Sequence, residues 1–112
     1  MSDAAELYNQ GEQLKDDGKY DEAIEKFKQV LEADDKYVLA HLALAVVYGK
    51  VGKHEEAIRH GQQACELDPS DPFNFTAMSV TFQRAFAGTQ NRHYIQLAEE
   101  AMARAHMLQG HR

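Results

Sequence analysis

The side chains best suited to chemistry in this chain are six histidines and a single cysteine. Two histidines four residues apart on a helix can bind one zinc ion, but no two of these histidines have that spacing. They are His41, His54, His60, His93, His106 and His111. We therefore expect ordinary surface or packing histidines and no metal site. Cys65 has no second cysteine, so an internal disulfide is excluded and a buried, inert thiol is expected.

Recognisable catalytic and cofactor-binding motifs are missing from the sequence. It contains no phosphate-binding loop, no nucleophile elbow and no paired-cysteine motif. No recognisable pattern places a nucleophile beside a general base. We therefore expect a non-enzymatic protein that uses no cofactor.

The composition indicates a folded protein without a basic surface. The 112 residues are 44% hydrophobic, and 18 acidic residues outnumber 12 lysines and arginines, which gives a net charge of −6. Binding to phosphate groups needs clustered basic residues, so nucleic acid is not an expected partner. No apolar stretch reaches the roughly 18 residues of a membrane span, and the start of the chain lacks the features of a signal peptide. We expect no membrane partner and a cytoplasmic location.

The charge is unevenly distributed along the chain. Residues 1–37 carry a net charge of −6, residues 38–71 a net charge of −2 and residues 72–112 a net charge of +2. One interpretation is that these charges only keep the outer faces solvated. The other is that the gradient orients a partner, or a second copy of the chain packed head to tail.

Local signals predict helices throughout the chain. Asp3 followed by Glu6 is typical of a helix start, and Gly18 is suited to a helix end. Asp71 and Pro72 form a second helix start, with Asp71 as the cap and Pro72 in the first turn. The segment 38–47 is almost continuously apolar, which predicts a helix buried on more than one side.

An internal repeat organises these helices. The segment 18–25 recurs 34 residues later as segment 52–59, with five of eight positions identical. A period of this length is typical of stacked helical hairpins that share a continuous core.

The repeat resembles the tetratricopeptide repeat. The resemblance implies an all-α fold, a right-handed α-solenoid of three antiparallel helix pairs, which would form a single domain over residues 1–112. The repeats would span about 4–37, 38–71 and 72–108. In the second repeat Gly61 stands where the family has a large aromatic residue, so we expect weaker packing there.

The third repeat departs from the pattern. A strict 34-residue step from Ala57 leads to Asn91, whereas the best match is Ala98, seven residues later. The sequence therefore predicts an insertion near residues 85–91, which could be helical or a loop. We expect the last helix to run from about His93 to Leu108, with no extra capping helix after it.

The resemblance also implies a concave groove lined by the first helix of each repeat. The groove residues would be Tyr8, Asn9, Glu12, Leu39, Leu42, Ala43, Val46, Phe73, Thr76, Ala77, Val80 and Arg84. Some family members clamp a peptide carboxylate with lysine, asparagine and arginine. The corresponding positions here are Tyr8, Glu12, Ala43, Phe73 and Ala77, which supply no cation, so the carboxylate clamp is absent.

The apolar centre of the predicted groove favours an apolar or amphipathic peptide. The function that we expect is that of a scaffold or adaptor for a protein or peptide partner. The alternative is a structural module that forms homo-oligomers through its uncapped last helix, around Met102, Ala105, His106 and Leu108.

Overall fold

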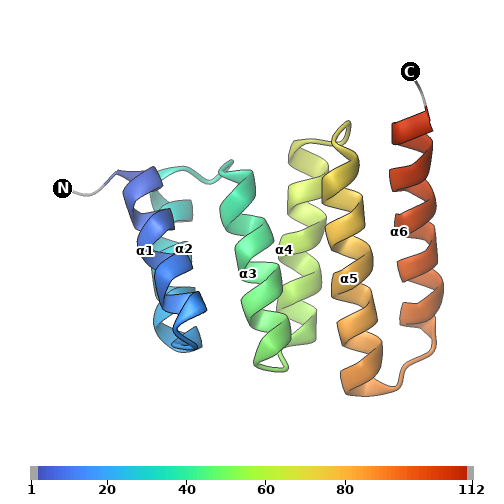
Figure 1. Cartoon of the computed structure of the whole chain (residues 1–112), viewed down its shortest axis with the longest axis horizontal. Helices are drawn as coiled ribbons and strands as arrows, with labels where there is room; N and C mark the ends of the chain where they lie inside the picture. Colours follow the sequence, from blue (N-terminus) through green and yellow to red (C-terminus); the bar gives the residue numbers. More distant parts are fainter. Residues whose placement is uncertain (1–2, 111–112) are drawn as a thin grey trace.

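The computed structural model describes residues 3–110, so His111 and Arg112 lie outside the described part. Within that range the chain forms six α-helices and no strand (Figure 1). The helices are α1 (Ala4–Asp16), α2 (Tyr20–Ala33), α3 (Val38–Lys50), α4 (His54–Leu67), α5 (Pro72–Thr89) and α6 (His93–Gly110). None of them is both long enough and apolar enough to span a bilayer.

The helices form three antiparallel pairs stacked in a row, which confirms the expected all-α solenoid (Figure 1). The first helices of the pairs are neighbours, since α3 contacts both α1 and α5. The second helices, α2, α4 and α6, do not contact one another. The inner side of the stack is therefore formed by α1, α3 and α5. The repeat boundaries given above remain a prediction.

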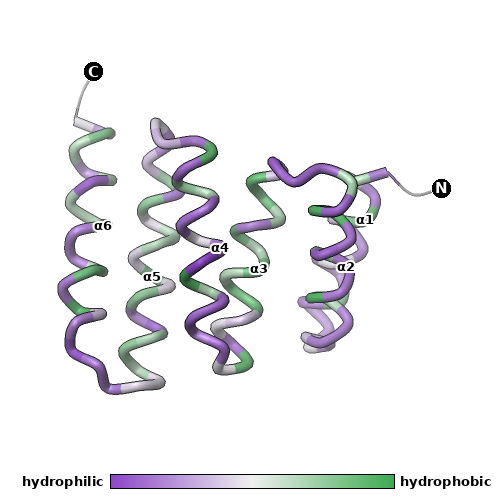
Figure 2. Tube along the Cα trace, turned by 180° about the vertical axis from the view of Figure 1, so that it is seen from behind, coloured by the Kyte–Doolittle hydropathy of each residue, from purple (hydrophilic) through white to green (hydrophobic). Residues whose placement is uncertain are grey.

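Helix α3 lies at the centre of the stack and contacts four other helices. It is the most uniformly hydrophobic helix, which Figure 2 shows as an almost continuous green and white segment. Leu44 and Val47 of α3 are fully buried, together with Phe27 of α2. A helix with neighbours on several sides has no wide solvated face, and this explains its continuous apolar run.

Local capping fixes where several helices begin and end. The Asp3 carboxylate accepts a hydrogen bond from the Glu6 amide at 2.8 Å, and the Asp71 carboxylate accepts one from the Phe73 amide at 2.9 Å. Both predicted helix starts are thus confirmed. Gly18 follows α1 with a φ of 78°, a backbone conformation that glycine adopts without strain.

The predicted insertion is mostly helical. Helix α5 continues to Thr89 and has 18 residues, against 13 in α1 and 13 in α3. The Thr89 hydroxyl donates to the Ala85 carbonyl at 2.7 Å, and Gln90 ends the helix in the left-handed conformation. Helix α6 also has 18 residues and ends at Gly110, two residues beyond the predicted end. The third pair is therefore the longest of the stack.

The space beside Gly61 is occupied by a side chain of the next helix pair. Gly61 is buried, and Met78 of α5 fills the space that a large side chain would otherwise occupy. A Cβ atom at Gly61 would lie 2.6 Å from the Met78 sulfur. Methionine is flexible and adapts to such gaps, so α4 and α5 are in contact at this position.

Candidate functional site

The inner side of the stack contains a hollow between α3 and α5. Its volume is about 210 Å³. Seven of the predicted groove residues line it, and they are Leu42, Val46, Phe73, Thr76, Ala77, Val80 and Arg84. The floor is completed by Ala45, Gly61, Met78 and Thr81, which the sequence reasoning did not assign to the groove.

Two large apolar side chains that line this hollow are exposed, and so is Leu39 near the start of α3. Phe73 is 60% exposed, Leu39 is 50% exposed and Val80 is 37% exposed. Leu42 is only 9% exposed and contributes a wall rather than a free side chain. An apolar hollow with exposed apolar side chains at its edge is typical of a protein-binding surface.

Phe73 is held in a well-defined place by the start of α5. The Asp71 carboxylate accepts a hydrogen bond from the Phe73 amide, and Pro72 restricts the backbone of the same turn. Thr76 is fixed as well, since its hydroxyl donates to the Pro72 carbonyl at 3.2 Å. Little backbone order would have to be gained when a ligand binds here.

The predicted groove residues of α1 lie apart from the hollow. The Tyr8 ring packs against Phe27 and Tyr37, with centroids 5.7 Å and 5.6 Å away. Burial, followed by the negative charge and hydrogen bond of Glu12, raises the pKa of Tyr8 to about 12. Glu12 is itself paired with Lys15 at 3.2 Å. Tyr8 is thus largely a packing residue, while Asn9 is exposed on the same helix.

Ala43 differs from its neighbours in the predicted groove. It is 6% exposed and belongs to the core cluster that contains Phe27 and Leu44. Its methyl group therefore packs inward. Ala43 is therefore not part of the exposed surface of the groove.

One cation lies at the hollow. Arg84 is the charged side chain that lines it, and no carboxylate is among the lining residues. The Arg84 side chain lies against α3, because a Cβ atom placed at Gly49 would be 3.5 Å from the Cδ atom of Arg84. The hollow can hold an apolar side chain and offers one guanidinium to a neighbouring carbonyl or carboxylate.

The sequence reasoning missed a contact between two histidines. The Nδ1 atoms of His41 and His60 lie 3.0 Å apart. The Tyr48 ring stacks on the His60 ring, with the two ring centroids 5.7 Å apart. Burial, followed by the positive charge of His41, lowers the pKa of His60 to about 4. The predicted pairing of the two helices of the second repeat is the signal that could have revealed this contact. Antiparallel helices bring residues such as His41 and His60 together although they are far apart in the sequence.

The histidines and the cysteine within residues 3–110 do not form a metal site. Across residues 3–110, no group of three or more histidine, cysteine or acidic side chains is placed to hold a metal ion. Cys65 is half-buried, and its thiol lies 3.5 Å from the Asn74 carbonyl oxygen. Burial, with a smaller effect of Glu66, raises the pKa of the Cys65 thiol to about 11, which keeps it protonated and weakly nucleophilic at neutral pH.

Known proteins share this architecture. The tetratricopeptide repeat family matches residues 3–70. The second tetratricopeptide repeat domain of Spaghetti (RPAP3), solved bound to the HSP90 peptide SRMEEVD, is 27% identical with a TM-score of 0.78. The alignment covers 96% of this chain and 93% of that one.

Two further structures are similar in fold. MamA is 16% identical with a TM-score of 0.80, and the match covers 96% of this chain but only 58% of MamA. PcrH, solved with the chaperone binding region of PopD, is 20% identical with a TM-score of 0.60 over 92% of this chain and 88% of PcrH. No curated protein matches this sequence.

Proposed function

Because the chain belongs to the tetratricopeptide repeat family, we propose that it is a non-enzymatic scaffold that binds a peptide segment of a partner protein on its inner side. The bound segment is apolar or amphipathic. It places one large apolar side chain in the hollow between α3 and α5, against Leu42, Val46 and Phe73. Burying a side chain of leucine or phenylalanine size contributes roughly 1.5–3 kcal/mol.

The observation that carries this proposal is the exposure of Phe73 and Val80, which line a partly enclosed apolar hollow. Isolated exposed apolar residues are common on proteins, but here they surround one concave site. Docking of the apolar face of an amphipathic segment in a hydrophobic groove is a recurring mode of peptide recognition.

The related structures support peptide binding as the general function. The RPAP3 domain is solved with an HSP90 peptide, and PcrH is solved with a region of PopD. The ligand of this chain should differ in chemistry from an acidic C-terminal peptide. The positions that the family uses to hold a carboxylate carry Phe73, Ala77 and Tyr8 among others, and none of them provides a cation.

The experiment uses a photo-crosslinking amino acid at Phe73 in a native lysate, with the same amino acid at Leu67 as the matched control. Leu67 is 38% exposed on α4 and does not line the hollow. We expect a crosslinked partner from position 73 that is absent from position 67. The variant Val80→Glu, at a residue with 37% exposure, should abolish that crosslink, whereas Leu67→Glu should not. The same crosslinked products from both positions would contradict the proposal.

Self-association through α6 is the second function predicted from the sequence. Ala105, at the centre of that predicted surface, is 1% exposed and cannot contact another molecule directly. Met107 is 56% exposed on the same helix. Sedimentation over a range of concentrations tests this function, and a monomer at every concentration would eliminate it.

A further inference from the structure

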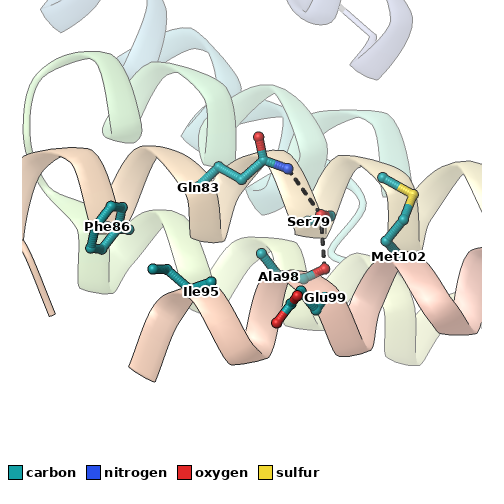
Figure 3. Close-up of a pocket in the computed structure, with 7 residues that line it drawn as sticks. All are labelled: Ser79, Gln83, Phe86, Ile95, Ala98, Glu99 and Met102. Carbon is teal, nitrogen blue, oxygen red and sulfur yellow. Dashed lines mark hydrogen bonds between the residues drawn. The ribbon is translucent and has the colours of Figure 1, made fainter. Parts of the chain in front are cut away.

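A second hollow lies at the end of the stack, between α5 and α6, and its volume is about 490 Å³. Figure 3 shows side chains from the two helices on opposite sides of it. Ser79, Gln83 and Phe86 come from α5, while Ile95, Glu99 and Met102 come from α6. Ile95 is 37% exposed, and Phe86 and Met102 are half-buried. The lining is therefore mainly apolar and open to solvent on one side.

The repeat register shows what this place corresponds to in the preceding pair. Ser79 and Gln83 are the counterparts of Ala45 and Gly49, 34 residues earlier. Met102 is the counterpart of Gly61, 41 residues earlier, because the seven-residue insertion lies between the two helices of the third pair. Gly49 and Gly61 both face α5, because Cβ atoms there would meet Arg84 and Met78. In the middle pair this position is thus occupied by the next helix. The hollow between α5 and α6 is the corresponding packing position in the last pair, and no described helix occupies it.

Head-to-tail packing of two copies would bring α1 of one copy to the hollow of the other copy. The residues of α1 do not suit that hollow. Met78 inserts toward Gly61, and its counterparts in the earlier pairs are Leu44 and Gln10. Leu44 is fully buried, but Gln10 is exposed, and so is Gln13 one turn further along α1. The face that α1 would present to another copy is polar, so it does not complement an apolar hollow.

The polar side chains in the lining are Ser79, Gln83 and Glu99. Gln83 donates its Nε2 to the Ser79 hydroxyl at 3.2 Å, and that hydroxyl donates to the Ala98 carbonyl at 2.9 Å. These bonds leave the Gln83 carbonyl oxygen pointing away from α6 (Figure 3). Glu99 adds a carboxylate, and no lysine or arginine of residues 3–110 lines the hollow. A ligand that fits should bring donors or positive charge to the edge.

We propose that this hollow binds one amphipathic helix of a partner protein, packed beside α5 and α6 as α5 is packed beside α3 and α4. The apolar stripe of the bound helix covers Phe86, Ile95 and Met102. A lysine or arginine of the bound helix lies beside Glu99. This surface is separate from the groove on the inner side and takes a different ligand, so either one can bind without the other.

The test uses two synthetic helical peptides of 18 residues, the length of α5. Both have leucines at i, i+4, i+7 and i+11, and their flanking positions are lysine in one peptide and glutamate in the other. Binding is followed by methyl NMR of Ile95 and Met102. We expect the lysine peptide to shift these methyl signals and to leave the Val80 methyls unchanged. The glutamate peptide should bind about tenfold or more weakly.

Matched variants separate specific binding from general attraction to an acidic protein. Met102→Glu should weaken binding of the lysine peptide about tenfold, while Met107→Glu, at an exposed residue of the same helix, should not. Glu99→Gln should weaken it, while Glu100→Gln at the adjacent exposed position should not. Equal effects of Glu99→Gln and Glu100→Gln, or of Met102→Glu and Met107→Glu, would overturn the proposal.

Two further outcomes also overturn it. The first is that the lysine peptide leaves the Ile95 and Met102 methyl signals unshifted. The second is that sedimentation shows a dimer that excludes the peptide, because the hollow would then be filled by a second copy. The variant Phe73→Glu should not alter binding of the lysine peptide, so failure of the groove proposal and failure of this one are distinguishable.

Discussion

The Nδ1 atom of His41 lies 3.0 Å from the Nδ1 atom of His60, and the Nε2 atom of His41 lies 3.1 Å from the Asp35 carbonyl oxygen. Since a carbonyl only accepts, His41 carries its proton on Nε2 when neutral. Its Nδ1 then accepts from the Nδ1 proton of His60. This assignment links α4, α3 and the turn before α3, and it requires both rings to be neutral.

We predict that the stability of the protein falls as the pH is lowered from about 6.5 to about 4. In the unfolded chain His60 binds a proton near its ordinary pKa of 6.5, whereas in the folded chain burial lowers that pKa to about 4. Protons therefore bind preferentially to the unfolded state over this range. Arg59 and Lys28 act in the same direction as burial, and Glu56 opposes them.

The loss from His60 should be about 1–2 kcal/mol, a reduced value because the ring is partly open to solvent. Urea unfolding at several pH values measures it. His60→Gln should flatten the profile above the range in which carboxylates titrate, and His106→Gln, at an exposed position, should leave it unchanged. An identical pH profile for the wild type and His60→Gln would contradict this prediction.

We predict that the HSP90 peptide SRMEEVD binds this chain at least about tenfold more weakly than an apolar peptide that the groove accepts. The acidic end of that peptide needs cationic donors, and among the described residues Arg84 is the one cation that lines the hollow. Isothermal titration calorimetry with both peptides measures the difference. Stronger binding of SRMEEVD would show that the groove recognises charge rather than apolar anchors.

Two helical glycines should respond oppositely to alanine. A Cβ atom at Gly11 would lie 2.6 Å from the fully buried Phe27 ring, so Gly11→Ala should destabilise the protein by about 1–3 kcal/mol. At Gly49 the nearest atom would be 3.5 Å away, so Gly49→Ala should stabilise it by roughly 0.5–1 kcal/mol through helix propensity. Thermal unfolding of both variants provides the comparison. Equal shifts of the same sign would refute the packing argument.

Asn74 should be one of the more sensitive polar positions. Its side chain is 1% exposed and donates to the Asp68 carbonyl at 3.0 Å and to the Ala64 carbonyl at 3.4 Å. Asn74→Ala removes both bonds at the α4–α5 connection and should cost about 1–3 kcal/mol. Asn9→Ala, at an exposed position, is the control and should change stability little. The free energy of unfolding in urea is the measurement.

Much of the fold could be predicted from local patterns. Asp3, Gly18 and Asp71 mark helix ends through bonds within a few residues, and such bonds are readable in the sequence. The 34-residue period predicted how the helices pair and stack. The candidate groove was predicted less completely, because the pattern selects the side of a helix and does not give the depth of each residue. Leu39 is half exposed, whereas Ala43, one helical turn later, is buried in the core.

The sequence by itself determined the helices and their pairing, since these depend on nearby residues and residue types. Only the tertiary structure decided that Met78 fills the space at Gly61 and that His41 contacts His60. It also decided that the last pair ends in an open apolar hollow. These features arise from side chains on different helices, and their distances are set by how the helices pack rather than by their separation along the chain.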